Sequence, residues 1–78
     1  MRQVGNKPVI NESIRESRSY RELSAYDAVG MAEGFVEANE EQRLAAWQWL
    51  HDSGMAYTLQ GAFGRMCQAL IQHGDIDE

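Results

Sequence analysis

Apolar residues recur at three- and four-residue intervals along most of the chain, which is the spacing expected of amphipathic helices. From about Ser19 to Glu33 this repeat predicts a first helix, whose repeating positions are Tyr20, Leu23, Tyr26 and Gly30. Ser19 and Glu22 have the form of a capping box, which supports a helix start at this point. The pair Glu33-Gly34 is predicted to end the helix.

Two further helices are predicted in the second half of the chain. Asn39 is a favourable N-cap with Gln42 at the third helical position, and Gly54 is the expected end of the second helix. The third helix is predicted over about 56–73, and Gly74 is expected to close it. Three helices joined by short turns predict an all-α fold, a small three-helix bundle.

The first part of the chain has a different character. Gly5, Asn6 and Pro8 interrupt any helical repeat, so residues 1–18 are expected to form a loose or extended basic N-terminal arm. Residues 19–78 are expected to form an acidic helical domain. The chain has neither the apolar run of a signal peptide nor that of a membrane span, so we expect a cytoplasmic protein that does not interact with membranes.

The helix faces divide into a predicted core and a remaining surface. The core stripe of the third helix is predicted to consist of Leu59, Phe63, Met66 and Leu70. The core stripe of the second helix is predicted to consist of Leu44, Trp47 and Leu50. Trp49 falls on the far side of the second helix, where an exposed tryptophan is a candidate anchor for a protein partner. The alternative is that the acidic loop or the arm covers its ring.

The side of the third helix opposite the predicted core contains Tyr57, Gly61, Gly64 and Ile71. An interior helix glycine costs roughly 1 kcal/mol relative to alanine, so a compensating contact is expected at Gly61 and Gly64. Close approach of another backbone is the natural compensation. We expect the first helix or the N-terminal arm to supply it, with a protein partner or a second copy in a homodimer as the alternatives.

Composition limits the chemistry that the chain can perform. The 78 residues contain one cysteine, Cys67, and two histidines, His51 and His73, that are far apart, so neither a disulfide nor a metal site is expected. Cys67 is expected to be a buried apolar group. The sequence has no phosphate loop and no Ser-His-Asp order, and we therefore expect no cofactor and no enzymatic activity.

The formal net charge of −5 conceals two regions of opposite sign. Residues 1–21 carry five basic and two acidic side chains, whereas residues 22–78 carry two basic and ten acidic ones. One interpretation is an ordinary solvated acidic surface that the arm partly neutralises. A sharper interpretation is that the carboxylates occupy a basic protein surface that normally holds phosphates. The residues expected to meet such a surface are Glu33, Glu37, Glu40, Glu41 and Asp52.

A DNA-binding helix-turn-helix is the alternative function, because the second and third predicted helices are separated only by residues 52–55. Its nucleic-acid contacts would come from Arg15, Arg18, Arg21 and Arg65. The acidic balance of residues 22–78 opposes attraction to phosphates, so direct nucleic-acid binding is not the favoured expectation.

The stretches 46–54, 59–65 and 70–74 resemble a family of short, uncharacterised proteins of tailed bacteriophages, and the most specific shared motif is Leu-Gln-Gly-x-Phe-Gly-Arg. The resemblance implies a phage or mobile-element origin and action in the cytoplasm of the bacterial host. Such phage proteins are commonly small inhibitors of host enzymes or defence complexes, including CRISPR complexes. We therefore expect a binding protein of the anti-CRISPR type, which occupies a basic surface of a host protein or nucleoprotein complex and blocks nucleic-acid access or nuclease recruitment.

Overall fold

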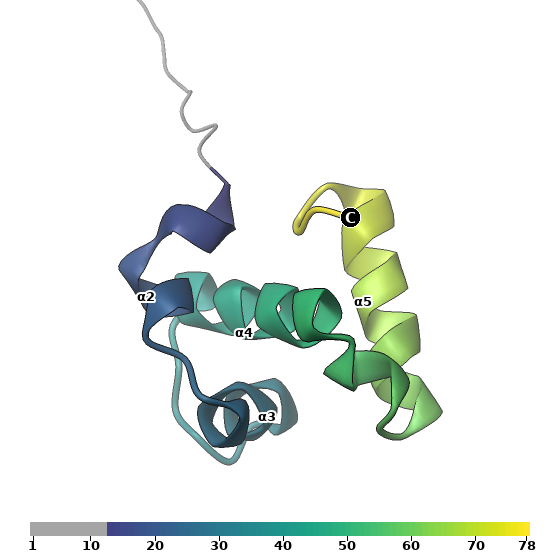
Figure 1. The fold of residues 1–78 in the computed structure, drawn as a ribbon, viewed down its shortest axis with the longest axis horizontal. Helices are drawn as coiled ribbons and strands as arrows, with labels where there is room; N and C mark the ends of the chain where they lie inside the picture. Colours follow the sequence, from purple (N-terminus) through teal and green to yellow (C-terminus); the bar gives the residue numbers. More distant parts are fainter. Residues whose placement is uncertain (1–12) are drawn as a thin grey trace, which may run out of the picture.

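One helix runs through the middle of the computed structural model, which describes residues 13–78 (Figure 1). This helix is α4 (Glu40–Ser53); α3 (Ala25–Glu33) lies below it in this view, and α5 (Gly61–His73) stands beside its C-terminal end, both at steep angles to it. Two short elements, η1 (Ile14–Glu16) and α2 (Arg18–Arg21), pack on a further side of α4. The 3-10 turn η2 (Met55–Tyr57) connects α4 to α5. The predicted all-α fold is confirmed, and no strand occurs within residues 13–78.

Helix α4 begins and ends where the sequence predicts. The Asn39 side chain accepts a hydrogen bond of 2.8 Å from the Gln42 backbone, and the Gln42 side chain accepts one of 2.9 Å from the Asn39 backbone. Glu40 and Glu41 in the first turn face the positive end of the helix dipole. Gly54 ends the helix in the left-handed conformation, with φ of 81°.

The first predicted helix is two helices. Ser17 caps α2 by accepting a hydrogen bond from the Tyr20 backbone, and Ser24 caps α3 by accepting one from the Asp27 backbone. Ser24 has an extended backbone, which separates the two helices. The prediction of one helix over 19–33 is wrong because serine side chains compete with the helical backbone for hydrogen bonds and favour cap positions.

The third predicted helix begins later than expected. Residues 55–57 form η2, and the Thr58 hydroxyl donates to the Met55 carbonyl at 2.9 Å. Gln60 is extended, so α5 starts only at Gly61. Its end is as predicted, because Gly74 closes it with φ of 83°.

The folded part of the chain reaches further towards the N-terminus than predicted. Residues 1–12 of the predicted arm lie outside the described residues. Residues 13–18 are not loose, since they form η1 and the start of α2 and contact α4. The Ser13 side chain caps η1 by accepting a hydrogen bond from the Arg15 backbone at 3.1 Å. The predicted division of the chain after residue 18 therefore does not correspond to a change from arm to domain.

A small apolar core lies where the three longer helices meet. The buried cluster consists of Ala28, Ala46, Trp47, Leu50, Ala56, Phe63, Cys67 and Ile76. The rings of Trp47 and Phe63 are in contact, with centroids 5.8 Å apart. Ile76 folds back after the end of α5 and is only 3% exposed. Several members are alanines, so the helices approach closely but bury few large side chains.

The inward face of α5 differs from the predicted stripe. Phe63 is buried and Leu70 is half-buried, as expected for core positions. Leu59 and Met66 are exposed instead, because Leu59 precedes the helix and the inward face is centred on Phe63 and Cys67. The two exposed side chains therefore contribute apolar surface and not core.

Candidate functional site

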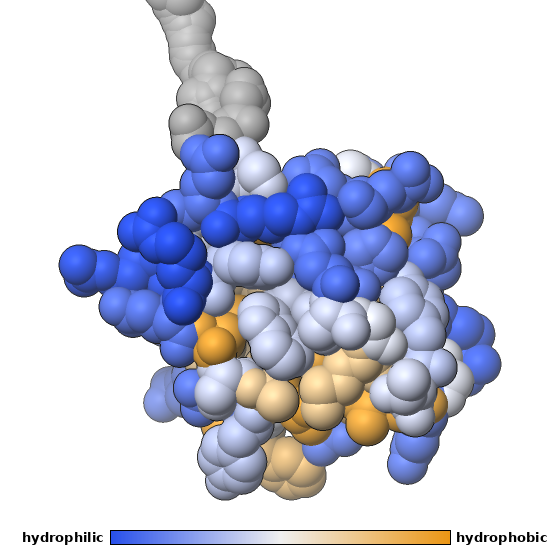
Figure 2. Space-filling model, viewed as in Figure 1, coloured by the Kyte–Doolittle hydropathy of each residue, from blue (hydrophilic) through white to orange (hydrophobic). Residues whose placement is uncertain are grey.

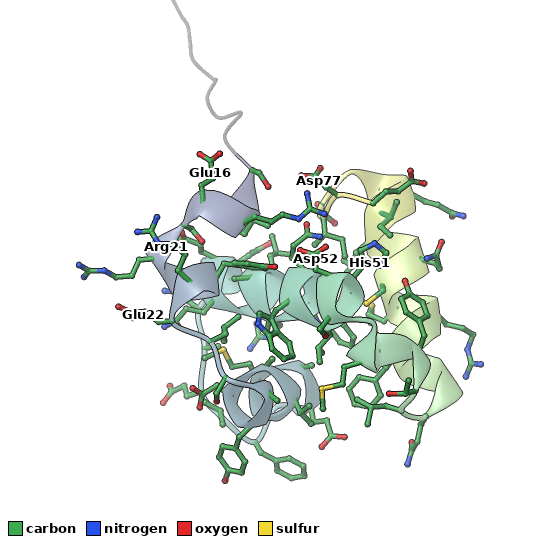
Figure 3. The ribbon with its side chains drawn as sticks, in the orientation of Figure 1. Glu16, Arg21, Glu22, His51, Asp52 and Asp77 are labelled. Carbon is green, nitrogen blue, oxygen red and sulfur yellow. The ribbon has the colours of Figure 1, made fainter. Side chains whose placement is uncertain are left out.

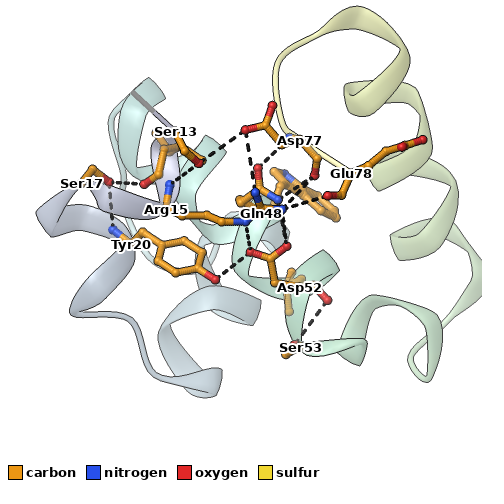
Figure 4. Close-up of polar contacts among 12 residues, drawn as sticks. Ser13, Arg15, Ser17, Tyr20, Gln48, Asp52, Ser53, Asp77 and Glu78 are labelled. Carbon is orange, nitrogen blue, oxygen red and sulfur yellow. Dashed lines mark hydrogen bonds and ion pairs between the residues drawn. The ribbon is translucent and has the colours of Figure 1, made fainter. Parts of the chain in front are cut away.

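The N-terminal segment, residues 13–21, is attached to α4 by polar contacts around Asp52 (Figure 4). The Arg15 guanidinium donates to both carboxylate oxygens of Asp52, at 2.7 and 2.8 Å. The Tyr20 hydroxyl donates to the same carboxylate at 2.7 Å, and the Gln48 amide donates to it at 3.1 Å. The Asp52 carboxylate thus accepts four hydrogen bonds from within the chain.

These contacts shift the ionisation of their members. Burial opposes ionisation of Asp52, but hydrogen bonds from Arg15, Tyr20 and Gln48 outweigh it, so the pKa of Asp52 is lowered. Burial and the hydrogen bond to Asp52 raise the pKa of Tyr20 to about 12. The sequence predicts that Asp52 meets a basic partner, and Arg15 contacts nucleic acid only in the helix-turn-helix alternative. Their charged groups instead face each other.

The C-terminal residues join the same group of contacts. Gln48 is completely buried, and its side chain donates to the Asp77 carbonyl at 2.8 Å and accepts from the Asp77 backbone N–H at 2.7 Å. Arg15 also donates to the Glu78 carbonyl at 3.0 Å. We call Arg15, Tyr20, Gln48, Asp52 and Asp77 the terminal cluster, and Figure 3 shows Asp52 and Asp77 on the same side of α4.

The sequence indicates Tyr20 only as a repeating apolar position of the first predicted helix, and it predicts no role for Gln48. One signal was available for Gln48, because it is the polar residue inside the apolar run from Leu44 to Leu50. A polar side chain at such a position needs a buried hydrogen-bond partner. The Asp77 backbone supplies that partner from 29 positions away, which no local pattern could indicate.

The other predicted acidic contacts are placed on the surface. Glu33, Glu37, Glu40 and Glu41 are all exposed. The ion pairs within residues 13–78 join Arg15 to Asp52 and Asp77 and Arg18 to Glu22, so none involves these four glutamates. They belong to residues 22–42, which contain six acidic and no basic side chains and which we call the acidic segment.

An apolar groove lies beside part of the acidic segment. It has a volume of about 500 Å³, and its walls come from α3, the loop after α3, and residues 55–59. We call it the α3 groove, and its main apolar lining residues are Tyr26, Val29, Phe35, Val36, Met55 and Leu59. Tyr26 and Phe35 are 82% and 83% exposed. Figure 2 shows hydrophilic surface over the N-terminal segment and paler to orange surface towards α3 and η2.

Trp49 is not the exposed anchor that the helical spacing predicts. It is half-buried and packs against the core cluster. Ala45, one turn earlier on the same side of α4, is completely buried. The α2 and η1 elements contact α4, so the N-terminal segment occupies surface that the sequence left open for a partner.

The glycine face of α5 is also covered differently from the prediction. A Cβ atom on Gly64 would lie 3.0 Å from the Tyr57 ring, so the close neighbour is a side chain of η2 and not the first helix or the arm. The Tyr57 hydroxyl accepts from the Gln68 amide at 2.9 Å and lies 2.7 Å from His51 Nδ1. Ile71 is half-buried and packs on the core cluster. Gly61 has only the Arg65 side chain near it.

The arginines of the helix-turn-helix alternative are dispersed. Arg18 pairs with Glu22, and Arg21 donates to the Glu16 carbonyl at 3.0 Å. Arg65 is exposed on α5, which stands at the C-terminal end of α4, whereas the N-terminal segment that carries the other three arginines lies towards the other end of α4 (Figure 1). The α4–α5 connection, residues 54–60, is longer than the roughly three- to four-residue turn of that motif.

Within 13–78, no group of three or more His, Cys, Asp or Glu side chains is placed to hold a metal ion. No helix in that part of the chain combines the length and the apolar composition needed to cross a membrane. Cys67 is completely buried, as predicted, and burial raises its pKa to about 11, so the thiol is protonated at neutral pH.

The family match covers the chain from α3 to the C-terminus but not the N-terminal segment. Residues 25–78, from the first residue of α3 onwards, match the family described as a domain of unknown function (DUF7417). Gln48 and Asp52 lie inside the match, whereas Arg15 and Tyr20 lie outside it. Among curated proteins and among solved structures, no significant match was found. Because the match spans more than half of the chain, the protein belongs to the DUF7417 family.

Proposed function

We propose that the protein is a small, non-enzymatic binding protein that docks on a basic surface of another protein or of a nucleoprotein complex. The observation that carries this proposal is the exposure of Glu33, Glu37, Glu40 and Glu41 without an ion pair to any residue of 13–78. Unpaired carboxylates of one sign attract a basic surface and speed its association.

The α3 groove supports the same function, because it places apolar surface next to this charge. Glu33 is itself one of the groove residues. Interfaces commonly combine an apolar centre with a polar rim, and the apolar part contributes most of the affinity. Carboxylates alone would mainly speed association, whereas an apolar groove beside them also slows dissociation of the complex.

The resemblance to bacteriophage proteins selects the target to test first. We propose a host defence or nucleic-acid-processing complex, of the CRISPR type, in the cytoplasm of the infected bacterium. Occupation of its basic surface blocks access of nucleic acid or recruitment of a nuclease.

The test uses the tagged full chain to capture partners from a lysate of the bacterial host, followed by affinity measurements on the purified partner. The informative variant removes three charges by Glu37→Gln, Glu40→Gln and Glu41→Gln. We expect it to slow association and to weaken binding, with a smaller salt dependence than the unmodified protein shows. Helicity, measured by circular dichroism, is expected to remain, because the Asn39–Gln42 cap is untouched.

A matched control removes the same number of charges elsewhere, by Glu16→Gln, Asp75→Asn and Glu78→Gln. We expect this control to retain most of the affinity. Equal affinities of the unmodified protein and of the acidic-segment variant would exclude docking by these carboxylates. Salt-dependent binding of duplex DNA that Arg65→Ala abolishes would support the helix-turn-helix alternative instead.

A further inference from the structure

We infer that the α3 groove is a docking site for an amphipathic helix of the partner, one with large apolar residues on one face and lysine or arginine beside them. This inference rests on the proposed function and names the part of the surface that makes the apolar contact. It follows from the fixed position of Phe35, the openness of the groove and the charge around it.

Phe35 is held in an exposed position by the turn that ends α3. Its backbone N–H donates to the Gly30 carbonyl at 2.8 Å, and the Gly34 N–H donates to the Met31 carbonyl at 3.3 Å. In a turn of this type the apolar residue after the glycine usually packs back on the residue that accepts its hydrogen bond. Here that residue is Gly30, which has no side chain, and the Phe35 ring remains 83% exposed.

Gly30 also fixes the wall of the groove next to Phe35. A Cβ atom at this position would lie 2.5 Å from Cγ2 of Val36, so only glycine permits the loop to approach α3 this closely. The Val36 N–H donates to the same Gly30 carbonyl at 3.1 Å. The groove is thus formed before a partner arrives, and a preformed apolar surface loses little conformational entropy on binding.

The shape of the groove favours a helix over a small molecule. Its volume of about 500 Å³ is within the usual range for ligand sites, but Tyr26 and Phe35 are each more than 80% exposed. A site for a small apolar ligand encloses most of the ligand, and these walls stand open to solvent. An open apolar groove of this kind accepts side chains that project from one face of a helix.

The negative charge around the groove favours a partner with positive charge. Glu33 lines the groove, and the acidic segment that supplies most of its residues contains no basic side chain. Nucleic acid and anionic lipid have the wrong sign for this surface. A second copy of the chain would bring two acidic segments together. A helix with lysine or arginine beside its apolar face has the complementary charge.

The test uses two synthetic helical peptides of about five turns with the same leucine pattern, one with a lysine-rich and one with a glutamate-rich polar face. Each is titrated into the ¹⁵N-labelled full chain and followed by NMR. We expect the lysine peptide to shift the amide resonances of residues 25–36 and 55–59, and these shifts to reach a plateau as the peptide concentration rises. The glutamate peptide is expected to have no such effect. Phe35→Ala is expected to lower the affinity of the protein for the lysine peptide about tenfold or more.

The variant is suited to the test because the Phe35 ring is 83% exposed and contributes little to folding. Met66→Ala is the matched control, since Met66 is 45% exposed on α5 outside the groove. We expect Met66→Ala to leave the peptide affinity unchanged. Equal binding of the lysine peptide by Phe35→Ala, or shifts confined to other elements, would overturn the inference.

Two further results would also overturn the inference. Self-association that Phe35→Ala abolishes, measured by analytical ultracentrifugation, would indicate a second copy. Equal binding of the two peptides would remove the charge argument. Failure of the groove inference can be distinguished from failure of the proposed function. If Phe35→Ala keeps full affinity for the captured partner while the acidic-segment variant loses it, the groove inference is wrong and the proposed function stands.

Discussion

The guanidinium of Arg15 donates two hydrogen bonds, of 2.7 and 2.8 Å, to the two carboxylate oxygens of Asp52, although the residues are 37 positions apart. A bidentate arginine–carboxylate pair is both strong and directional. It attaches the N-terminal segment to the last turn of α4 and places that segment beside the C-terminal residues. A part of the chain outside the DUF7417 match is therefore integral to the folded domain.

Replacement of Asp52 by asparagine should loosen the N-terminal segment. An amide cannot accept both guanidinium hydrogen bonds, and we expect the free energy of unfolding to fall by about 1–2 kcal/mol. The estimate is modest because the Asp52 and Arg15 side chains are 21% and 35% exposed. Urea denaturation measures the loss, and hydrogen exchange should quicken at residues 14–21. Asp75→Asn, at an exposed position outside the cluster, serves as the control and should change neither measurement.

Acid should weaken the same contact. The pKa of Asp52 is lower in the folded protein than in the unfolded chain, so its contribution is complete above the unfolded pKa and is lost as the pH falls through the folded pKa. We expect the stability difference between the unmodified protein and Asp52→Asn to be full at neutral pH and to shrink below about pH 4. A difference that stays constant down to the acid limit would show that the charge of Asp52 is not what stabilises the segment.

Gln48→Met should be more damaging than a change of size alone would suggest. Methionine has a similar length but leaves the Asp77 N–H and carbonyl without the partners at 2.7 and 2.8 Å. Loss of these part-buried hydrogen bonds is expected to cost about 2 kcal/mol in the free energy of unfolding. Thermal and urea denaturation provide the measurement. If the loss is the same in a chain that ends at residue 76, which keeps the buried Ile76, the Asp77 contacts are not its cause.

Two glycine substitutions should have opposite effects. Gly30→Ala places a Cβ atom 2.5 Å from Val36, and we expect the resulting displacement of the loop to cost about 1–3 kcal/mol. Gly61→Ala meets only the flexible Arg65 side chain, at 3.0 Å, and is expected to stabilise by less than about 1 kcal/mol, because Gly61 is the first residue of α5 and not an interior position. Denaturation of both variants under one set of conditions checks the pair. A stabilised Gly30→Ala would contradict the close approach of the loop.

Cys67 should be inert in the folded protein. It is completely buried, and burial raises its pKa to about 11, so little thiolate is present at neutral pH. We expect alkylation by iodoacetamide to be slow in buffer and fast in urea, with a rate that follows the unfolded fraction. Mass spectrometry of timed samples measures it. Rapid alkylation without denaturant would mean that α5 opens locally.

The sequence predicts the parts of this fold that depend on short-range chemistry. The capping box of Asn39 and Gln42 and the closing glycines Gly54 and Gly74 are found where expected, because a cap is decided within a few residues of backbone. The same local reasoning was wrong at Ser17, which caps α2 in place of Ser19, and at Ser24, whose cap divides a helix that the apolar repeat made continuous.

The candidate binding surface was predictable in part. The exposure of Glu33, Glu37, Glu40 and Glu41 agrees with their spacing on a charged stretch, although the function that we assign to them stays a prediction. The α3 groove was not predicted. The groove depends on the exposed position of Leu59, which the sequence predicts in the core. It also depends on the turn after α3, which leaves Phe35 exposed.

The sequence by itself determined an all-helical chain, the ends of α4 and the burial of Trp47, Leu50 and Cys67, since helical periodicity and caps are local properties. Only the tertiary structure decided that the N-terminal segment covers α4, that Asp52 serves the fold and that the groove of α3 stays open. These outcomes depend on pairs such as Arg15 with Asp52 and Gln48 with Asp77, which are 37 and 29 positions apart. Nothing in the local spacing of a chain determines which distant polar groups will meet.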